Sequence, residues 1–167
     1  MAGKKSAPKE TSFEDKLWNT AELLRGQVSP TAYKDIALGL LFLKFISYWY
    51  DQRRAELEKL TDDPKSDIYC KTAKEKLYML NLKDQYTSKG IFYLKEGDKW
   101  EDLTKIVSVE KNLAIKIDSM IQIIEKDNPE LENVLPKRFS QSEIPNDHLG
   151  QLIENFNEIS THDISED

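Results

Sequence analysis

The chain has 167 residues and a mass of 19.4 kDa, enough for one domain with a hydrophobic core of its own. Its net charge is -6, which excludes the strong overall positive field typical of proteins that bind nucleic acid tightly. A single cysteine excludes an internal disulfide and favours a reducing compartment. Residues 1–11 contain no apolar leader, so we expect a cytoplasmic protein.

The charge is unevenly distributed along the chain. Residues 1–109 hold 19 Lys and Arg against 17 Asp and Glu, a net +2, whereas residues 110–167 hold 5 against 13, a net -8. We therefore expect any contact with nucleic acid to come from the first two thirds of the chain. A flexible basic tail over residues 1–11 and an acidic tail over residues 161–167 are predicted to flank a folded domain at residues 12–160.

The first predicted helix begins near residues 11–14, where Thr11 and Glu14 have the spacing of a capping box. Its apolar stripe recurs at helical spacing through Leu17, Ala21, Leu24 and Val28. Only a short turn separates this helix from the next one. A connection of that length predicts that the two helices pack against each other as a hairpin.

The whole domain is predicted to be organised around a central helix over residues 30–60. Ser29 is a good N-cap residue, and Pro30 fits the first helical position because its missing N–H is not needed there. Between residues 37 and 50 apolar side chains occupy every side of the helix, as in a helix buried on most sides. Lys44 interrupts this run before it reaches the roughly 20 apolar residues of a membrane span, so no membrane association is expected.

Three positions in the apolar run carry specific expectations about packing. Gly39 is expected where another backbone approaches closely, because glycine costs about 1 kcal/mol in a helix and needs a reason to be there. Phe42 and Leu43 are expected to be core residues, whose truncation to alanine costs roughly 2–5 kcal/mol.

A polar stripe emerges on the same helix at spacings of three and four residues, through Lys44, Ser47, Asp51, Arg54 and Glu58. The simpler interpretation is a solvated face whose charges pair weakly along the helix. The alternative is a surface for a partner or for nucleic acid. The candidates for DNA or partner contact are Lys34, Lys44, Arg53 and Arg54.

The rest of the chain also favours helices. A weak stripe runs from Tyr69 to Leu80, a cleaner one from Leu113 to Ile124, and a last helix capped by Asn146 or Asp147 carries Leu149, Leu152, Phe156 and Ile159. Only residues 91–94 are typical of a strand. The fold class predicted is therefore all-α or nearly so: a multi-helix domain around the buried helix 30–60, with at most one short β element near 91–94.

No catalytic, cofactor-binding or metal-binding residue can be assigned from motifs. The sequence contains no phosphate loop, no nucleophile elbow and no metal-ligand spacing, and its glycines are isolated. His148 and His162 are expected to be structural or solvent-exposed, and Cys70 to be an inert thiol. Asn128 and Pro129 are interpreted as a helix stop.

Four segments resemble the opening of the modification (methyltransferase) subunit of type I restriction-modification systems. The first is Phe-Glu-Asp-Lys-Leu-Trp-Asn-Thr-Ala-Glu-Leu-Leu-Arg-Gly at residues 13–26, and the second is Tyr-Lys-Asp-Ile-Ala-Leu-Gly-Leu-Leu-Phe-Leu-Lys-Phe-Ile at 33–46. Residues 123–136, Ile-Ile-Glu-Lys-Asp-Asn-Pro-Glu-Leu-Glu-Asn-Val-Leu-Pro, and 149–153, Leu-Gly-Gln-Leu-Ile, are similar to later parts of the same N-terminal domain. The resemblance spans residues 12 to 160.

The resemblance implies a helical domain that precedes an S-adenosylmethionine-binding, adenine-methylating domain. The family's catalytic motif is Asn-Pro-Pro followed by an aromatic residue, and here Asn128-Pro129 is followed by Glu130-Leu131, so no catalytic residue is carried over. The implied roles are weak holding of DNA within the parent complex and docking to the specificity subunit, a second modification subunit and the restriction subunit. S-adenosylmethionine is expected as cofactor of the parent protein and not of this chain. The alternative is a stand-alone helical adaptor that binds only protein.

Overall fold

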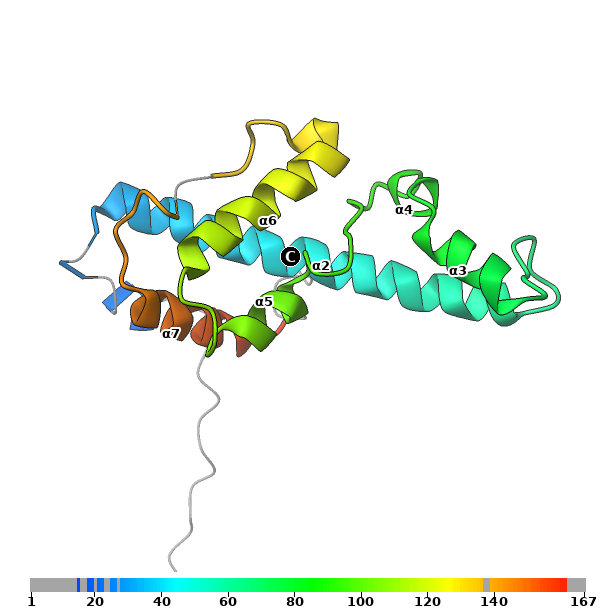
Figure 1. Cartoon of the computed structure of the whole chain (residues 1–167), viewed down its shortest axis with the longest axis horizontal. Helices are drawn as coiled ribbons and strands as arrows, with labels where there is room; N and C mark the ends of the chain where they lie inside the picture. Colours follow the sequence, from blue (N-terminus) through cyan, green and yellow to red (C-terminus); the bar gives the residue numbers. More distant parts are fainter. Residues whose placement is uncertain are drawn as a thin grey trace, which may run out of the picture.

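The structure, a computed structural model, describes residues 28–136 and 139–161, together with residues 15, 18–19, 21–22 and 25–26. Within these residues it contains six helices that are labelled in the element order from α2 onward (Figure 1). They are α2 (Pro30–Asp62), α3 (Ala73–Asn81), α4 (Asp84–Thr87), α5 (Trp100–Ile106), α6 (Leu113–Asp127) and α7 (Asn146–Asn157), with a short 3₁₀ helix at Pro129–Leu131.

The prediction of an all-α fold is confirmed, since the described part of the chain contains no strand. The strand-like residues 91–94 are extended, and their backbone pairs with a side chain instead. The buried amide of Asn128 accepts a hydrogen bond from the Tyr93 N–H at 2.8 Å and donates one to the Tyr93 carbonyl at 2.9 Å. The Asn128 side chain therefore satisfies both backbone groups of Tyr93, as a neighbouring strand would.

Helix α2 runs through the whole described domain and organises it (Figure 1). It has 33 residues, about 50 Å at 1.5 Å per residue. The predicted start is confirmed: Ser29 is the N-cap, its Oγ accepts a hydrogen bond from the Ala32 N–H at 3.2 Å, and Pro30 is the first helical residue. The middle of α2 packs against α5 and α7, and its C-terminal part packs against α3. No helix of the described residues is long and apolar enough to cross a membrane.

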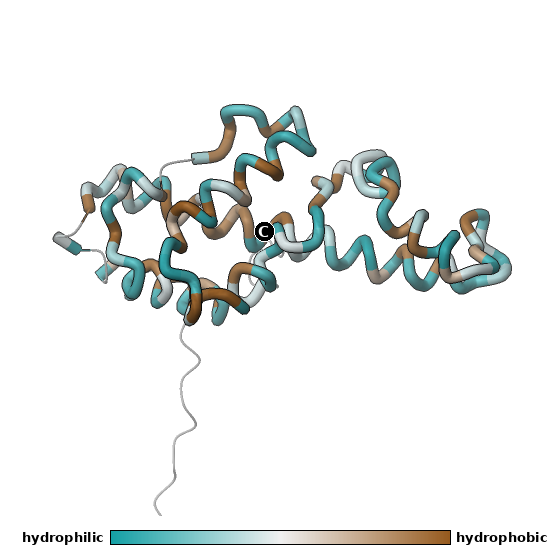
Figure 2. Tube along the Cα trace, viewed as in Figure 1, coloured by the Kyte–Doolittle hydropathy of each residue, from teal (hydrophilic) through white to brown (hydrophobic). Residues whose placement is uncertain are grey.

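The core lies where α2, α6 and α7 meet. The apolar stripes predicted for α6 and α7 are confirmed, because their members are buried: Leu113, Ile117, Met120, Ile121 and Ile124 on α6, and Leu149, Leu152 and Phe156 on α7, with Ile159 just beyond it. In Figure 2, hydrophobic (brown) and hydrophilic (teal) stretches alternate along both helices. Burying such stripes against one another is the main force that holds a bundle of this kind together.

The expectations for the apolar run of α2 are met in part. Leu43 is a core residue, but Phe42 is only half-buried and lies at the edge of a surface groove. Gly39 does mark a close approach, yet the neighbours are side chains and not backbone. A Cβ at Gly39 would lie 2.9 Å from Cζ of the buried Phe139 and 3.3 Å from Cγ of Pro136, so glycine makes room for this loop.

The prediction of a helical stripe from Tyr69 to Leu80 is wrong at its start. Tyr69 belongs to the turn that precedes the helix, and α3 begins at Ala73 after a capping box formed by Thr72 and Glu75. Of the predicted stripe only Leu80 is buried. The predicted hairpin partner near residues 11–27 falls largely outside the described residues, as do the basic tail and most of the acidic tail.

Candidate nucleic-acid and partner-binding surfaces

Lys44 is buried, and the interpretation of its stripe as a solvated face is wrong at this position. Its Nζ donates hydrogen bonds to the carbonyl oxygens of Phe156 at 2.6 Å and Asn157 at 3.0 Å, and also to that of Ile159. It lies 5.8 Å from the centre of the Trp100 ring. Helix C-termini leave carbonyls unsatisfied and carry partial negative charge, so this lysine caps α7.

Ser47, the next member of the stripe, is also buried. Its Oγ donates to the Leu43 carbonyl at 2.7 Å and accepts a hydrogen bond from the Trp100 N–H at 2.8 Å. The Trp100 indole N–H in turn donates to the Asn157 side chain at 2.9 Å. Lys44 and Ser47 therefore form a polar connection that joins α2 to the end of α7 and to the start of α5.

Arg53 is buried as well, with 6% of its surface exposed. Its Nε donates to the Gln85 carbonyl at 2.9 Å, and its Nη1 pairs with Glu56 at 2.7 Å. Lys44 and Arg53, two of the candidates for DNA contact, thus have their donors directed at other groups of this domain. Both are largely withdrawn from the surface and stabilise the packing of α2.

Lys34 and Arg54 remain at the surface. Lys34 is exposed on the first turns of α2. Arg54 is half-buried; its Nη1 donates to the Leu80 carbonyl at 3.1 Å and to the Asn81 side chain at 3.2 Å. Twenty residues of helix, about 30 Å, separate the two. The structure therefore does not bring the four candidates together into one site, and contact of Lys34 and Arg54 with DNA stays a prediction.

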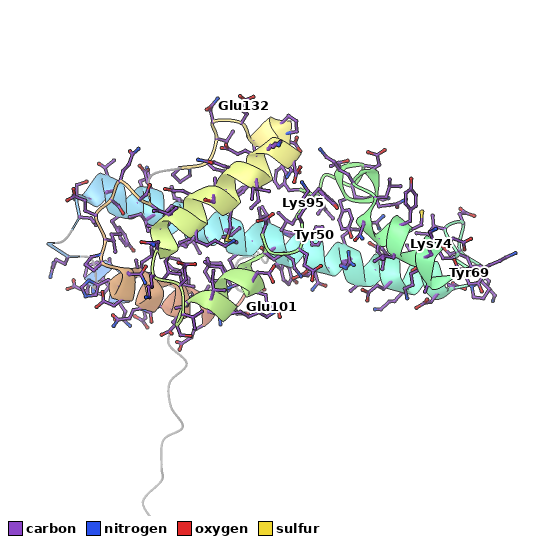
Figure 3. All side chains as sticks on the ribbon, viewed as in Figure 1. Tyr50, Tyr69, Lys74, Lys95, Glu101 and Glu132 are labelled. Carbon is purple, nitrogen blue, oxygen red and sulfur yellow. The ribbon has the colours of Figure 1, made fainter. Side chains whose placement is uncertain are left out.

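Arg54 borders a polar basin of about 400 Å³ that the sequence did not reveal. Its other cations, Lys95, Lys99 and Lys105, come from α5 and the segment before it. Each has a carboxylate nearby: Lys95 pairs with Asp127 at 2.7 Å, Lys99 with Asp51 at 3.3 Å, Lys105 with Glu101 at 2.9 Å, and Arg54 lies 3.9 Å from Glu58. Such exposed pairs are weak and exchange readily, so phosphate groups can compete for these cations. Figure 3 places Lys95 and Tyr50 side by side over the middle of α2.

Tyr50 and Tyr93 line this basin, and the buried Tyr86 packs behind them. The rings of Tyr50 and Tyr86 stack with centres 4.5 Å apart, and Tyr93 meets both edge-on. Burial, together with a hydrogen bond to Tyr86, raises the pKa of Tyr50 above its ordinary value. Burial also raises the pKa of Tyr93, so the hydroxyls of Tyr50 and Tyr93 stay protonated at neutral pH.

A second groove, of about 590 Å³, is apolar and lies along the outer side of α2. It is lined by Phe42, Phe45, Trp49 and the extended residues 91–92. The rings of Phe42 and Phe92 lie 6.0 Å apart across it. Aromatic side chains left partly exposed in this way are typical of protein–protein contact surfaces.

The described residues hold no cluster of three or more His, Cys, Asp or Glu side chains able to bind a metal ion. His148 is half-buried in the first turn of α7, His162 lies outside the described residues, and Cys70 is a half-buried free thiol. Asn128 is fully buried with its amide bonded to Tyr93, so it is a structural residue.

Comparison with known proteins relates the chain to a family. The family described as HsdM N-terminal domain matches residues 13–156. The chain belongs to this family. It is 34% identical over 149 residues to the Type I restriction enzyme MjaIX methylase subunit of Methanocaldococcus jannaschii, in an alignment that covers 89% of this chain and 26% of that protein. The chain thus spans about a quarter of the length of that relative, and the resemblance inferred from the sequence is confirmed.

Within this HsdM N-terminal domain, most of the basin could not be predicted from a sequence motif. Lys95, Lys99 and Lys105 are spaced irregularly and belong to no motif. They converge because the chain between Tyr93 and α5 folds back over the middle of α2. Only the tertiary structure assembles them with Arg54.

Proposed function

We propose that this chain is the N-terminal domain of an adenine-specific DNA methyltransferase subunit of a type I restriction-modification system. In this proposal the domain helps to hold DNA and docks partner subunits, which are the specificity subunit, a second modification subunit and the restriction subunit. The observation that carries it is the match to the HsdM N-terminal domain over residues 13–156. The name of the relative, a methylase subunit about four times as long as the aligned region, supports the same assignment.

We place methyl transfer, with S-adenosylmethionine as cofactor, in a part of the parent protein that this chain does not contain. Cofactor sites of this type are built from alternating strands and helices, with a glycine-rich turn at a strand end. The described residues of this chain are helical instead. Asn128 and Pro129 are not followed by an aromatic side chain that could stack on a flipped adenine.

The proposed DNA contact is electrostatic and weak. The cations that we propose to contact phosphates are Lys34 and those of the basin, which are Arg54, Lys95, Lys99 and Lys105. Carboxylates already pair with the basin cations, so a phosphate must displace a carboxylate to bind. The net binding free energy is therefore only the difference between the cation–phosphate and the cation–carboxylate interactions. A few such contacts supply sequence-independent affinity that falls steeply with salt.

Fluorescence anisotropy of a labelled DNA duplex tests this proposal. We expect weak binding by the chain at low salt, with the logarithm of the association constant falling linearly with the logarithm of the salt concentration. The double variant Lys95→Ala/Lys105→Ala should bind several-fold more weakly and show a shallower salt slope. The matched control is Lys126→Ala, which removes an exposed lysine of α6 outside the basin and should bind like the wild type. Tight binding that discriminates between DNA sequences at physiological salt, or basin variants with unchanged binding, would contradict the proposal.

A second candidate function is a stand-alone adaptor that binds only protein. The apolar groove along α2, with its partly exposed aromatic rings, is the observation that favours it. The coding sequence distinguishes the two functions. Continuation past Asp167 into a glycine-rich loop and an Asn-Pro-Pro-aromatic motif supports the methyltransferase subunit, and a stop codon at this point supports the adaptor.

A further inference from the structure

Helix α2 carries an apolar face that the domain core does not bury. Leu38, Phe42, Phe45 and Trp49 follow one another at spacings of four, three and four residues, which places them on one side of the helix. Leu38 is 50% exposed and Trp49 is 40% exposed, while Phe42 and Phe45 are half-buried. The described part of the chain therefore leaves this side of α2 apolar and partly open.

The C-terminal half of this face forms one wall of the apolar groove of about 590 Å³, which we call the α2 groove. The extended residues 90–92 form the other wall. The Ile91 N–H donates to the Tyr86 carbonyl at 3.1 Å, and Asn128 holds the backbone of Tyr93 directly after this wall. The Phe45 and Trp49 rings meet edge-on with centres 6.0 Å apart. Both walls of the groove are thus held in place by the fold.

The chemistry of the α2 groove decides which kind of occupant fits. Lys89 is the one charged side chain among the described residues that line it. A DNA duplex, which needs several cations for its phosphates, therefore does not fit. A second copy of this chain fits poorly as well, because a two-fold contact would set groove against groove and leave both unfilled. The occupant that fits is an uncharged, apolar segment that protrudes into the groove.

The end of α7 lies against the same turns of α2, on another side of the helix. Lys44, the neighbour of Phe45 in sequence, binds the carbonyls of Asn157 and Ile159. A helix with its side chains is about 10–12 Å across, and residues 162–167 can span at most about 20 Å. A segment that follows residue 167 in the parent protein is therefore within reach of the α2 groove.

The proposed function places most of the parent protein outside this chain. The aligned region covers only 26% of the Methanocaldococcus relative. A segment joined to the domain by a short linker has an effective concentration in the millimolar range, far above that of a separate subunit. Such a segment covers the open apolar face as soon as it folds, before any other subunit assembles.

We propose that the α2 groove docks the part of the same polypeptide that follows this domain, which inserts uncharged apolar side chains between Trp49 and Phe92. This inference rests on the proposed function, because that function places the S-adenosylmethionine-binding part after this domain. It assigns the groove to a permanent contact within one methyltransferase subunit and leaves the separate basin to DNA.

Hydroxyl-radical labelling followed by mass spectrometry tests this contact, because it measures the exposure of individual side chains. The 167-residue chain is compared with the parent subunit, expressed from the coding sequence that continues past Asp167. We expect Trp49 to be labelled at least about fivefold more slowly in the parent subunit, whereas Tyr78, 66% exposed on α3, should be labelled equally in both. In the parent subunit, Phe45→Glu should restore the Trp49 rate to within about twofold of that in the 167-residue chain. The matched control Tyr78→Glu should leave Trp49 protected.

Circular dichroism checks the fold of both variants, and the comparison of the two wild-type proteins stands whichever variant folds. The inference is overturned if Trp49 is labelled equally in both proteins, or if it is protected only after the specificity subunit is added. It is also overturned if the 167-residue chain already protects Trp49 as well as the buried Trp100. A parent subunit that binds S-adenosylmethionine but leaves Trp49 open contradicts this inference alone. A coding sequence that stops at Asp167 contradicts the proposed function, and this inference with it.

Discussion

Replacing Lys44 by methionine is expected to lower the free energy of unfolding by about 2–4 kcal/mol and to loosen the end of α7. Hydrogen bonds from a charged donor are worth about 1.5–3 kcal/mol each, and the cost of burying the ammonium group offsets part of the total. Methionine keeps the length and most of the volume of the side chain but donates nothing to the carbonyls of Phe156, Asn157 and Ile159. These carbonyls would then have to accept hydrogen bonds from water, which requires the end of α7 to move toward solvent.

Urea denaturation and hydrogen exchange together check this expectation. Exchange should accelerate mainly at the amides of residues 156–161, where the capped segment lies. Lys34→Met is the matched control, because Lys34 lies on the same helix but is exposed, and its substitution should change stability by less than about 0.5 kcal/mol. An unchanged midpoint for Lys44→Met would show that the lysine is not required as a cap.

Leu43→Ala is expected to cost roughly 2–5 kcal/mol, and Phe42→Ala clearly less, although phenylalanine loses more atoms. Leu43 is fully enclosed, so its truncation leaves a cavity between α2 and its neighbours. Phe42 is half-buried at the wall of the open groove along α2, where water refills the space that its ring leaves. The adjacent positions make the pair a matched comparison on one helix.

The midpoints and slopes of urea unfolding curves for the two variants give the comparison. Equal slopes show that both variants unfold in the same way, so the shift in midpoint measures stability. A Phe42→Ala variant that is destabilised as much as Leu43→Ala would mean that the groove is closed in solution.

The parts of the fold that follow local rules could be predicted from sequence. The N-cap at Ser29, the apolar run of α2 and the stripes of α6 and α7 all follow from spacing along the chain. The prediction of the α7 cap was less accurate. Asn146 is the first residue of α7, and its side chain instead accepts a hydrogen bond from the Leu113 N–H at 2.8 Å, at the start of α6.

The functional surfaces could not be predicted, because they depend on contacts between distant parts of the chain. Lys44 and Ser47 have the spacing of a solvated stripe, and only the carbonyls at the end of α7, more than a hundred residues later, make Lys44 a buried cap. Arg53 likewise finds its acceptor on Gln85. A polar residue on a helix is exposed or buried according to what packs over it, and spacing alone does not carry that information.

Titration calorimetry with S-adenosylmethionine tests most directly the central claim, that this chain is a DNA-holding and docking domain without a methyl-transfer site of its own. We expect no heat beyond that of dilution when the cofactor is added to the purified chain, with or without a DNA duplex. Stoichiometric binding at micromolar concentration would contradict it and would show that the chain contains a cofactor site.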